Sequence, residues 1–285
     1  MASSLPRCLY CGATLPEGAQ RQVEEPDSAS DRVVLVVDTT AGAGVLGEAL
    51  GLSPAEAALR TRRGRHQLHR ILAAGEAETE ARRLAERGVA AILLPEDEVR
   101  QASRPRIARG GDPESGSLWL AERGETVRLE AGEVLTVLWG PIRCELARRD
   151  PGPLRTQRLA PRGRIHEREV YHVHVRADLR PLEIEPAAFE FSQGLGGLES
   201  SRLRVQRALE ALAPGIPIDR SFGVEAPALG VSPESAPEPP SALDDLRAKS
   251  DPHAPQRPTA VALDNLEQFR FHSAWRGVLV RRLAG

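Results

Sequence analysis

The chain has 285 residues, a formal net charge of −2 and a pI of about 6.4. This length suits two modest domains, and the charge balance argues against wholesale binding to nucleic acid or a membrane surface. Three cysteines are too few for a disulfide framework. The sequence shows no N-terminal apolar signal region and no run of 18 apolar residues. We therefore expect a cytoplasmic protein without a membrane span.

Residues 1–30 contain a cysteine pair followed by sequence rich in Pro, Gly, Glu and Ser. We interpret them as a Cys knuckle on a flexible tether. The segment Cys8-Leu9-Tyr10-Cys11-Gly12 resembles one knuckle of a zinc ribbon. A structural zinc ion needs four ligands, so histidines or the pair of a second chain in a homodimer would have to complete the site. Cys8 and Cys11 are therefore candidate zinc ligands, and a degenerate ribbon without metal is the alternative.

Residues 31–100 alternate between strand and helix patterns. An unbroken apolar run at 33–37 predicts a strand covered on both faces, and a short helix follows at 45–50. Ser53 and Glu56, with Pro54 between them, form a capping box that opens a second helix. Its apolar residues at 55, 58 and 59 share one face, and arginines end it.

The same module continues with a strand at 68–72, a helix at 76–87 and a buried-type strand at 89–94. Residues 50–57 and 76–89 resemble the C-terminal domain of the ribosomal stalk protein and the related fold of the Clp-protease N-degron adaptor. The resemblance implies a βααβαβ fold over about a quarter of the chain. The stalk domain meets translation factors through a face with several lysines, and this module has none. No functional residue is therefore transferred from either family.

Residues 101–115 are polar and are expected to form a linker. The region 116–230 then shows successive strand patterns at 118–120, 127–129, 134–139, 171–175 and 182–184. Several of them alternate as half-exposed antiparallel strands do. A helix at 200–213 closes the region, which loosely resembles a pleckstrin-homology-like barrel. Residues 231–260 are Pro-rich and are expected to be a disordered linker.

Residues 261–285 regain apolar character and predict a terminal helix. We expect this helix to dock on the chain's own domains, in a partner's groove or on an anionic membrane. Taken together, the patterns predict an α+β protein. It consists of a small βααβαβ module followed by a mainly antiparallel β domain closed by one helix, with disordered linkers.

Two further groups of residues suggest binding chemistry. His172 and His174 are two residues apart on a predicted strand, so their side chains point to the same face. Two histidines arranged in this way are a recognised geometry for binding a metal ion. We interpret that face as the polar outer side of a half-buried strand, because no complete ligand set accompanies it. A basic loop is expected between residues 143 and 168. Its arginines Arg148, Arg149, Arg162 and Arg164 are candidates for binding RNA or other phosphates.

The sequence contains no G-x-S-x-G, Walker or His-Glu-x-x-His motif to which a catalytic role can be assigned. Two modules joined by linkers suit assembly, because tethering raises effective concentration. We therefore expect a non-enzymatic adaptor that binds a protein partner through the first module's helix pair and the terminal helix. The alternatives are a zinc protein that uses Cys8, Cys11 and histidines, and an RNA- or phosphate-binding protein that uses the arginine loop.

Overall fold

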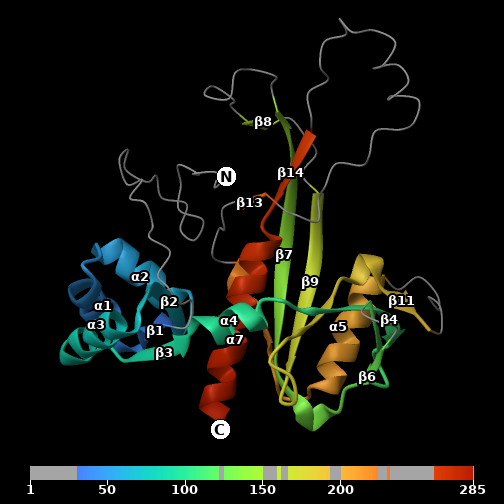
Figure 1. The fold of residues 1–285 in the computed structure, drawn as a ribbon, viewed down its shortest axis with the longest axis horizontal. Helices are drawn as coiled ribbons and strands as arrows, with labels where there is room; N and C mark the ends of the chain where they lie inside the picture. The colour runs from blue at the N-terminus through green and yellow to red at the C-terminus, as the bar shows by residue number, and fades with distance from the viewer. Residues whose placement is uncertain are drawn as a thin grey trace, which may run out of the picture.

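The computed structural model describes residues 31–121, 125–149, 159–161, 166–192, 200–223, 230–231 and 260–284. These residues form two sheets, and the C-terminal helix α7 (Leu266–Ala284) lies between them (Figure 1). The order of elements confirms the predicted α+β class, with a small three-stranded module first and a larger mixed sheet second. None of the helices described is long and apolar enough to cross a membrane.

The first module has the predicted βααβαβ order, and its three strands pair antiparallel in the order β2-β1-β3. Its elements are β1 (Arg32–Asp38), the 3-10 turn η2 (Thr39–Ala41), α1 (Ala43–Leu50), α2 (Pro54–Arg62), β2 (His66–Ala73), α3 (Ala74–Glu86) and β3 (Ala91–Pro95). The central strand is buried on both faces, as its unbroken apolar run predicts. Leu35 and Val37 pack against α1 and α3, whereas Val34 and Val36 pack against α7.

The capping box at the start of α2 is confirmed. The Ser53 hydroxyl accepts from the Glu56 amide at 3.3 Å, and the Ser53 amide donates to Glu56 Oε2 at 2.9 Å. The predicted apolar face of this helix was wrong. Ala57 is the buried residue, while Leu59 remains 48% exposed. The helix α2 therefore lies on the outside of the module and buries one small side chain, that of Ala57.

The predicted linker at residues 101–115 was also wrong. After α4 (Glu96–Ala102), the segment forms β4 (Arg106–Asp112) inside the second sheet, between β5 and the strands β10 and β11. Two glycines of this strand are required by close backbone contacts. A Cβ on Gly110 would overlap the Glu190 carbonyl, and one on Gly111 would overlap the Ser117 carbonyl.

The second sheet follows the path β13-β14-β7-β9-β10-β4-β5-β6, with β11 paired to β4 and with β8 and β12 paired to β7. Most pairs are antiparallel, and β4 runs parallel to β10 and β11. Its remaining elements are β5 (Ser117–Leu120), β6 (Thr126–Arg128), η3 (Ala131–Glu133), β7 (Val134–Arg149), β8 (Leu159–Pro161), β9 (His166–Val175), β10 (Leu182–Ile184), η4 (Pro186–Ala188), β11 (Glu190–Phe191), α5 (Ser201–Leu212), β12 (Ile218–Asp219), η5 (Ser221–Gly223), β13 (Gly230–Val231) and β14 (Ala260–Asp264).

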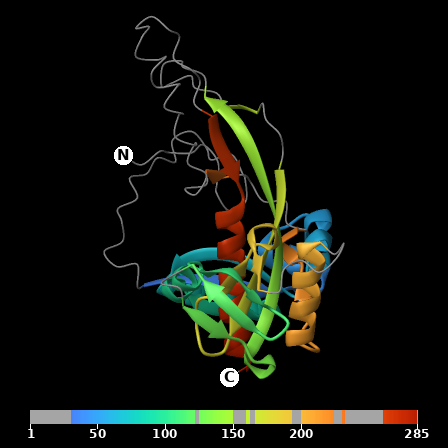
Figure 2. The ribbon, with the colours of Figure 1, turned by 90° about the vertical axis from the view of Figure 1, so that its right-hand side faces the viewer.

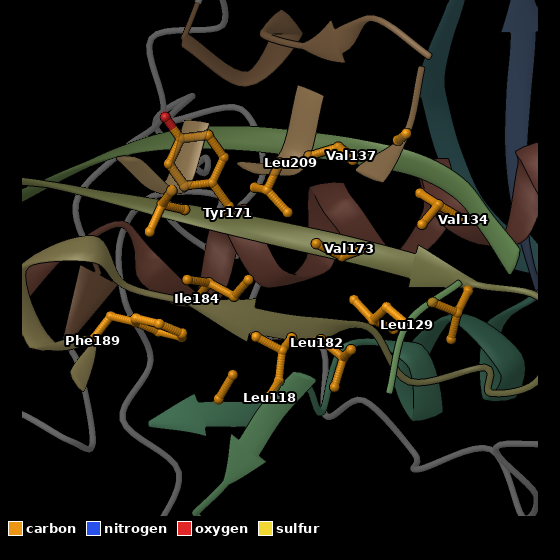
Figure 3. Close-up of a cluster of buried hydrophobic side chains, with 14 of the residues drawn as sticks. Leu118, Leu129, Val134, Val137, Tyr171, Val173, Leu182, Ile184, Phe189 and Leu209 are labelled. Carbon is orange, nitrogen blue, oxygen red and sulfur yellow. The ribbon is translucent and has the colours of Figure 1, made fainter. Parts of the chain in front are cut away.

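One face of the second sheet carries the main apolar core. Tyr171 and Val173 of β9 and Leu182 and Ile184 of β10 lie in one interior, together with Leu209 of α5 (Figure 3). The apolar face of α5 at Val205, Ala208 and Leu209 is buried there, as the sequence predicts. The helix begins at a Ser200 cap whose hydroxyl accepts from the Leu203 amide.

The opposite face of the second sheet is covered by α7, which stands between this sheet and the first module (Figures 1 and 2). The helix has ten buried residues and packs Ala274, Trp275, Val278 and Leu279 against the first module. Its N-terminal end packs Leu266 and Phe269 against β7. The prediction of a terminal helix is confirmed, although residues 260–264 form a strand. Of the places expected for it, the chain's own domains are where α7 docks, and its role as a contact surface for a partner stays a prediction.

Candidate functional site

A layer of buried polar side chains lies where α7 crosses the second sheet. His172, His174 and Glu183 are at most 6% exposed, and all three face α7 rather than solvent. The interpretation of His172 and His174 as a polar outer face was therefore wrong. The strand β9 is buried on both sides because a helix about a hundred residues further along the chain covers its polar side.

Glu183 of β10 is the centre of this layer. Its two oxygens accept from Arg270 Nε and Nη2 of α7, each at 2.8 Å, and Oε2 also accepts from His172 Nε2 at 3.0 Å. Burial by itself would raise the pKa of Glu183, but these hydrogen bonds outweigh burial and hold the pKa at about 2. The group is thus a permanently charged carboxylate that fixes helix to sheet.

The same contacts determine the state of His172. A carboxylate only accepts, so His172 Nε2 carries a proton and donates it to Glu183. Nδ1 is buried and has no hydrogen-bond partner among the described residues, while the Phe269 ring lies 4.6 Å from the imidazole, between centroids. Full burial lowers the pKa of His172, because the charged ring would lose its hydration. His172 therefore donates through Nε2 to Glu183.

Two serine–histidine contacts extend the layer along α7. His174 Nε2 lies 2.8 Å from Ser273 Oγ, and His272 Nε2 lies 3.1 Å from Ser221 Oγ. Burial lowers the pKa of both His174 and His272 to about 3, so neither ring is a base near neutral pH. This arrangement fixes the position of α7 and has no poised nucleophile.

An open cleft of about 430 Å³ lies beside the buried layer, and Glu183 forms part of its wall. Arg168 bonds Glu185 there at 2.9 Å, and the exposed Arg109 stands at the same opening. The cleft is therefore lined by charges of both signs. Glu183 therefore borders this cleft and is also bonded to Arg270 of α7.

Of the candidate zinc and phosphate ligands predicted from the sequence, only Arg148 and Arg149 lie in the part of the chain that the structure describes. Cys8 and Cys11 lie outside the described residues, as do Arg162 and Arg164. Arg148 and Arg149 belong to β7, which extends to residue 149, so that part of the expected loop is a strand. Among the side chains described, no group of three His, Cys, Asp or Glu residues is arranged to hold a metal ion. Zinc binding and phosphate binding at these residues stay predictions.

The polar residues of α7 are the site residues that sequence reasoning missed. Arg270, His272 and Ser273 stand among apolar positions of the terminal helix. Their signal was the failure of that helix to show a clean polar face. A buried arginine implies an acidic partner, and Glu183 between Leu182 and Ile184 is the matching anomaly on the sheet.

No protein-family model, curated protein or solved structure matches this chain. The resemblances to the stalk domain, the degron adaptor, the zinc ribbon and the pleckstrin-homology-like barrel therefore stay predictions.

Proposed function

We propose that the protein is a non-catalytic adaptor whose α1–α2 pair binds an acidic segment of a protein partner. The supporting observation is the exposure of apolar side chains beside arginines on this pair. Leu59 is 48% exposed and Val45 is 38% exposed, and α2 holds to the module at Ala57. Burying two such side chains against a partner would favour association by the hydrophobic effect.

The charge of the helix pair supports an acidic partner. The C-terminal end of α2 and the residue after it carry three arginines, at positions 60, 62 and 63, whereas the two glutamates of the pair, at 48 and 56, lie earlier in the chain. Glu56 is engaged in the capping box, and Arg62 is exposed. This local positive charge next to an exposed leucine suits a helix or strand that presents carboxylates around an apolar residue.

The placement of the pair also supports the proposal. The α1–α2 pair lies on the side of the first module away from α7, which joins that module to the second sheet (Figure 1). A partner could therefore bind the pair without disturbing the buried polar layer. The first module, fixed to the second sheet by α7, would hold the two binding helices in position.

The experiment is site-specific photo-crosslinking in cells, with the crosslinking residue at position 59 and, as a control, at position 203. Leu203 of α5 is similarly exposed, at 52%, but lies on the other domain. We expect position 59 to capture a protein with an acidic segment that position 203 does not capture.

The captured protein is then purified and its affinity is measured for the wild-type chain and for matched variants. Leu59→Glu and Arg62→Glu should each weaken binding at least tenfold, because an anion would then face the acidic segment. Leu203→Glu should leave binding unchanged. Equal binding by wild type and Leu59→Glu would refute the proposed surface.

A further inference from the structure

The strand β2 is an outer strand of the first module's sheet. In the order β2-β1-β3 it pairs with β1 alone among the described strands, so its other edge carries backbone groups that this sheet does not use. An extended segment of another chain can join a sheet at such an edge as an added strand. An open groove of about 390 Å³ lies along β2, between Arg70 and Leu72 of the strand and the first two turns of α3. This groove could receive side chains of the added strand.

A hydrogen bond at the end of β1 shows which residues of β2 point outward. The Asp38 amide donates to the Ala90 carbonyl, on the β3 side of β1. Residues along a central strand alternate between bonding one neighbour and bonding the other, so those at 37, 35 and 33 bond β2. Arg70, the partner of Leu35, therefore bonds inward, and the next residue, Ile71, directs its N–H and C=O outward. Ile71 thus offers a donor and an acceptor to an added strand.

The free part of this edge begins after the first residue of β2. The His66 carbonyl also points away from β1, and it accepts from Arg276 Nη1 of α7 at 3.3 Å. The edge beyond it, at residues 68–73, is the part where a strand could be added.

Arg70 gives this edge a preference for negative charge. Its side chain is exposed, lines the groove and has no ion pair or hydrogen bond with a described residue. Glu80 of the same groove already accepts from Arg83 Nε at 2.7 Å and Nη2 at 2.6 Å. A carboxylate on the added strand would therefore complement Arg70, whereas Glu76, also in the lining, disfavours a second carboxylate nearby.

We propose that the edge of β2 from Leu68 to Ala73 binds an extended segment of a protein partner as an added strand, with one carboxylate of that segment at Arg70. Backbone hydrogen bonds to Ile71 supply affinity, because they use groups that the sheet leaves free. Side chains two positions apart on a strand share a face, so the residue two positions from the carboxylate lies at Leu72 and should be apolar. This surface is distinct from the α1–α2 pair, and the proposal does not rest on that pair.

The test is selection from a phage-displayed library of random peptides on the full-length chain, after depletion of the library on the Arg70→Glu chain. Depletion removes peptides that bind elsewhere on the molecule. We expect the remaining peptides to carry an acidic residue two positions from an apolar one. Their affinity for the Arg70→Glu chain should be lower by about tenfold or more, because the carboxylate would then face an anion. The proposal is overturned if no peptide remains after depletion.

Two control variants make this result specific. Arg82→Glu reverses the charge of another exposed arginine of the first module, one that does not line the groove, and should leave peptide binding unchanged. Leu59→Glu should also leave it unchanged, which separates this test from that of the α1–α2 surface. Thermal melts of Arg70→Glu and Arg82→Glu should match wild type, since both side chains are exposed.

A second measurement tests whether the selected peptide joins the sheet. N-methyl groups placed one at a time along the peptide remove single amide donors, and only alternate positions should abolish binding if the peptide forms a strand. Hydrogen exchange at Ile71 should slow in the complex, while exchange in β3, at the opposite edge, should not change. Binding that tolerates every N-methyl group, or protection of β3 instead of β2, would overturn the proposal.

Discussion

Gly277 of α7 lies directly against the imidazole ring of His174 on β9, so closely that a Cβ at position 277 would overlap the ring. The helix can approach the sheet at this point because residue 277 lacks a side chain. Ser273, one turn earlier, holds the same ring by a hydrogen bond of 2.8 Å. Glycine inside a helix is normally unfavourable, and here its small size allows the contact.

Gly277→Ala should therefore lower stability, although alanine is the better helix former. We expect a loss of about 1–3 kcal/mol, as overpacking of a tight core produces, measured by urea unfolding. Gly44→Ala is the control. Gly44 also lies in a helix, but a Cβ there has no atom within 4 Å, so this change should be neutral or stabilising by up to about 1 kcal/mol. Equal effects of the two substitutions would contradict the close contact.

Replacing Trp275 tests whether packing against α7 stabilises the first module. Trp275 is 2% exposed and packs with Val34, Leu94 and Val99 of that module. Trp275→Ala should cost about 3–5 kcal/mol, as expected for removing a buried tryptophan side chain. Hydrogen exchange should show faster exchange in β1 and β3 than in wild type. Unchanged protection of β1 would mean that the module does not depend on this helix.

The Glu183–Arg270 pair predicts a large coupling energy. Arg270→Met leaves a buried carboxylate without its bidentate partner and should cost about 3–5 kcal/mol. The double variant Glu183→Gln, Arg270→Met should cost less than the two single variants together, because neither charge is then stranded. Arg143→Ala breaks the exposed Arg143–Glu167 pair and should cost at most about 1 kcal/mol. Additive single effects at 183 and 270 would contradict the buried pair.

The parts of the fold that the sequence predicted correctly are those determined by near neighbours. The capping box at Ser53 involves only the four residues from Ser53 to Glu56, and the apolar run that predicts β1 spans five consecutive residues. Both signals therefore stand in the sequence itself. The β4 segment was mistaken for a linker because its residues are polar, whereas its strand is determined by pairing with β10 and β11, which lie far along the chain.

The candidate site was hidden for the same reason. His172 and His174 looked like an outer face because polar residues alternated with apolar ones along one strand. His174 bonds Ser273, and the Glu183 that His172 bonds is itself held by Arg270. Ser273 and Arg270 lie about a hundred residues away, on a helix whose position depends on two sheets. Periodicity describes which residues share a face, but it does not say what covers that face.

The three buried histidines predict that stability falls on mild acidification. Burial lowers the pKa values of His172, His174 and His272 in the folded protein, to about 3 for His174 and His272, so those two rings stay neutral in mild acid. The unfolded chain binds these protons near pH 6.5, so the stabilisation is complete above that pH and is lost as the pH falls through and below it. His174 and His272 each contribute about 1.4 kcal/mol over the whole interval from about one pH unit above 6.5 to about one below it, or about 3 kcal/mol for the two, and His172 adds in the same direction.

Urea unfolding at about pH 7.5 and about pH 5.5 should therefore differ by at least about 3 kcal/mol, because His66 and His69, whose pKa values burial also lowers, act in the same direction. The window isolates the histidines, because Glu80 and Glu183, with pKa values of about 2, lose their contribution only below their ordinary value of 4.5. His174→Asn should reduce the difference by about 1.4 kcal/mol, since one titrating group is gone. A pH dependence that is unchanged in His174→Asn would show that this ring takes up its proton while still folded.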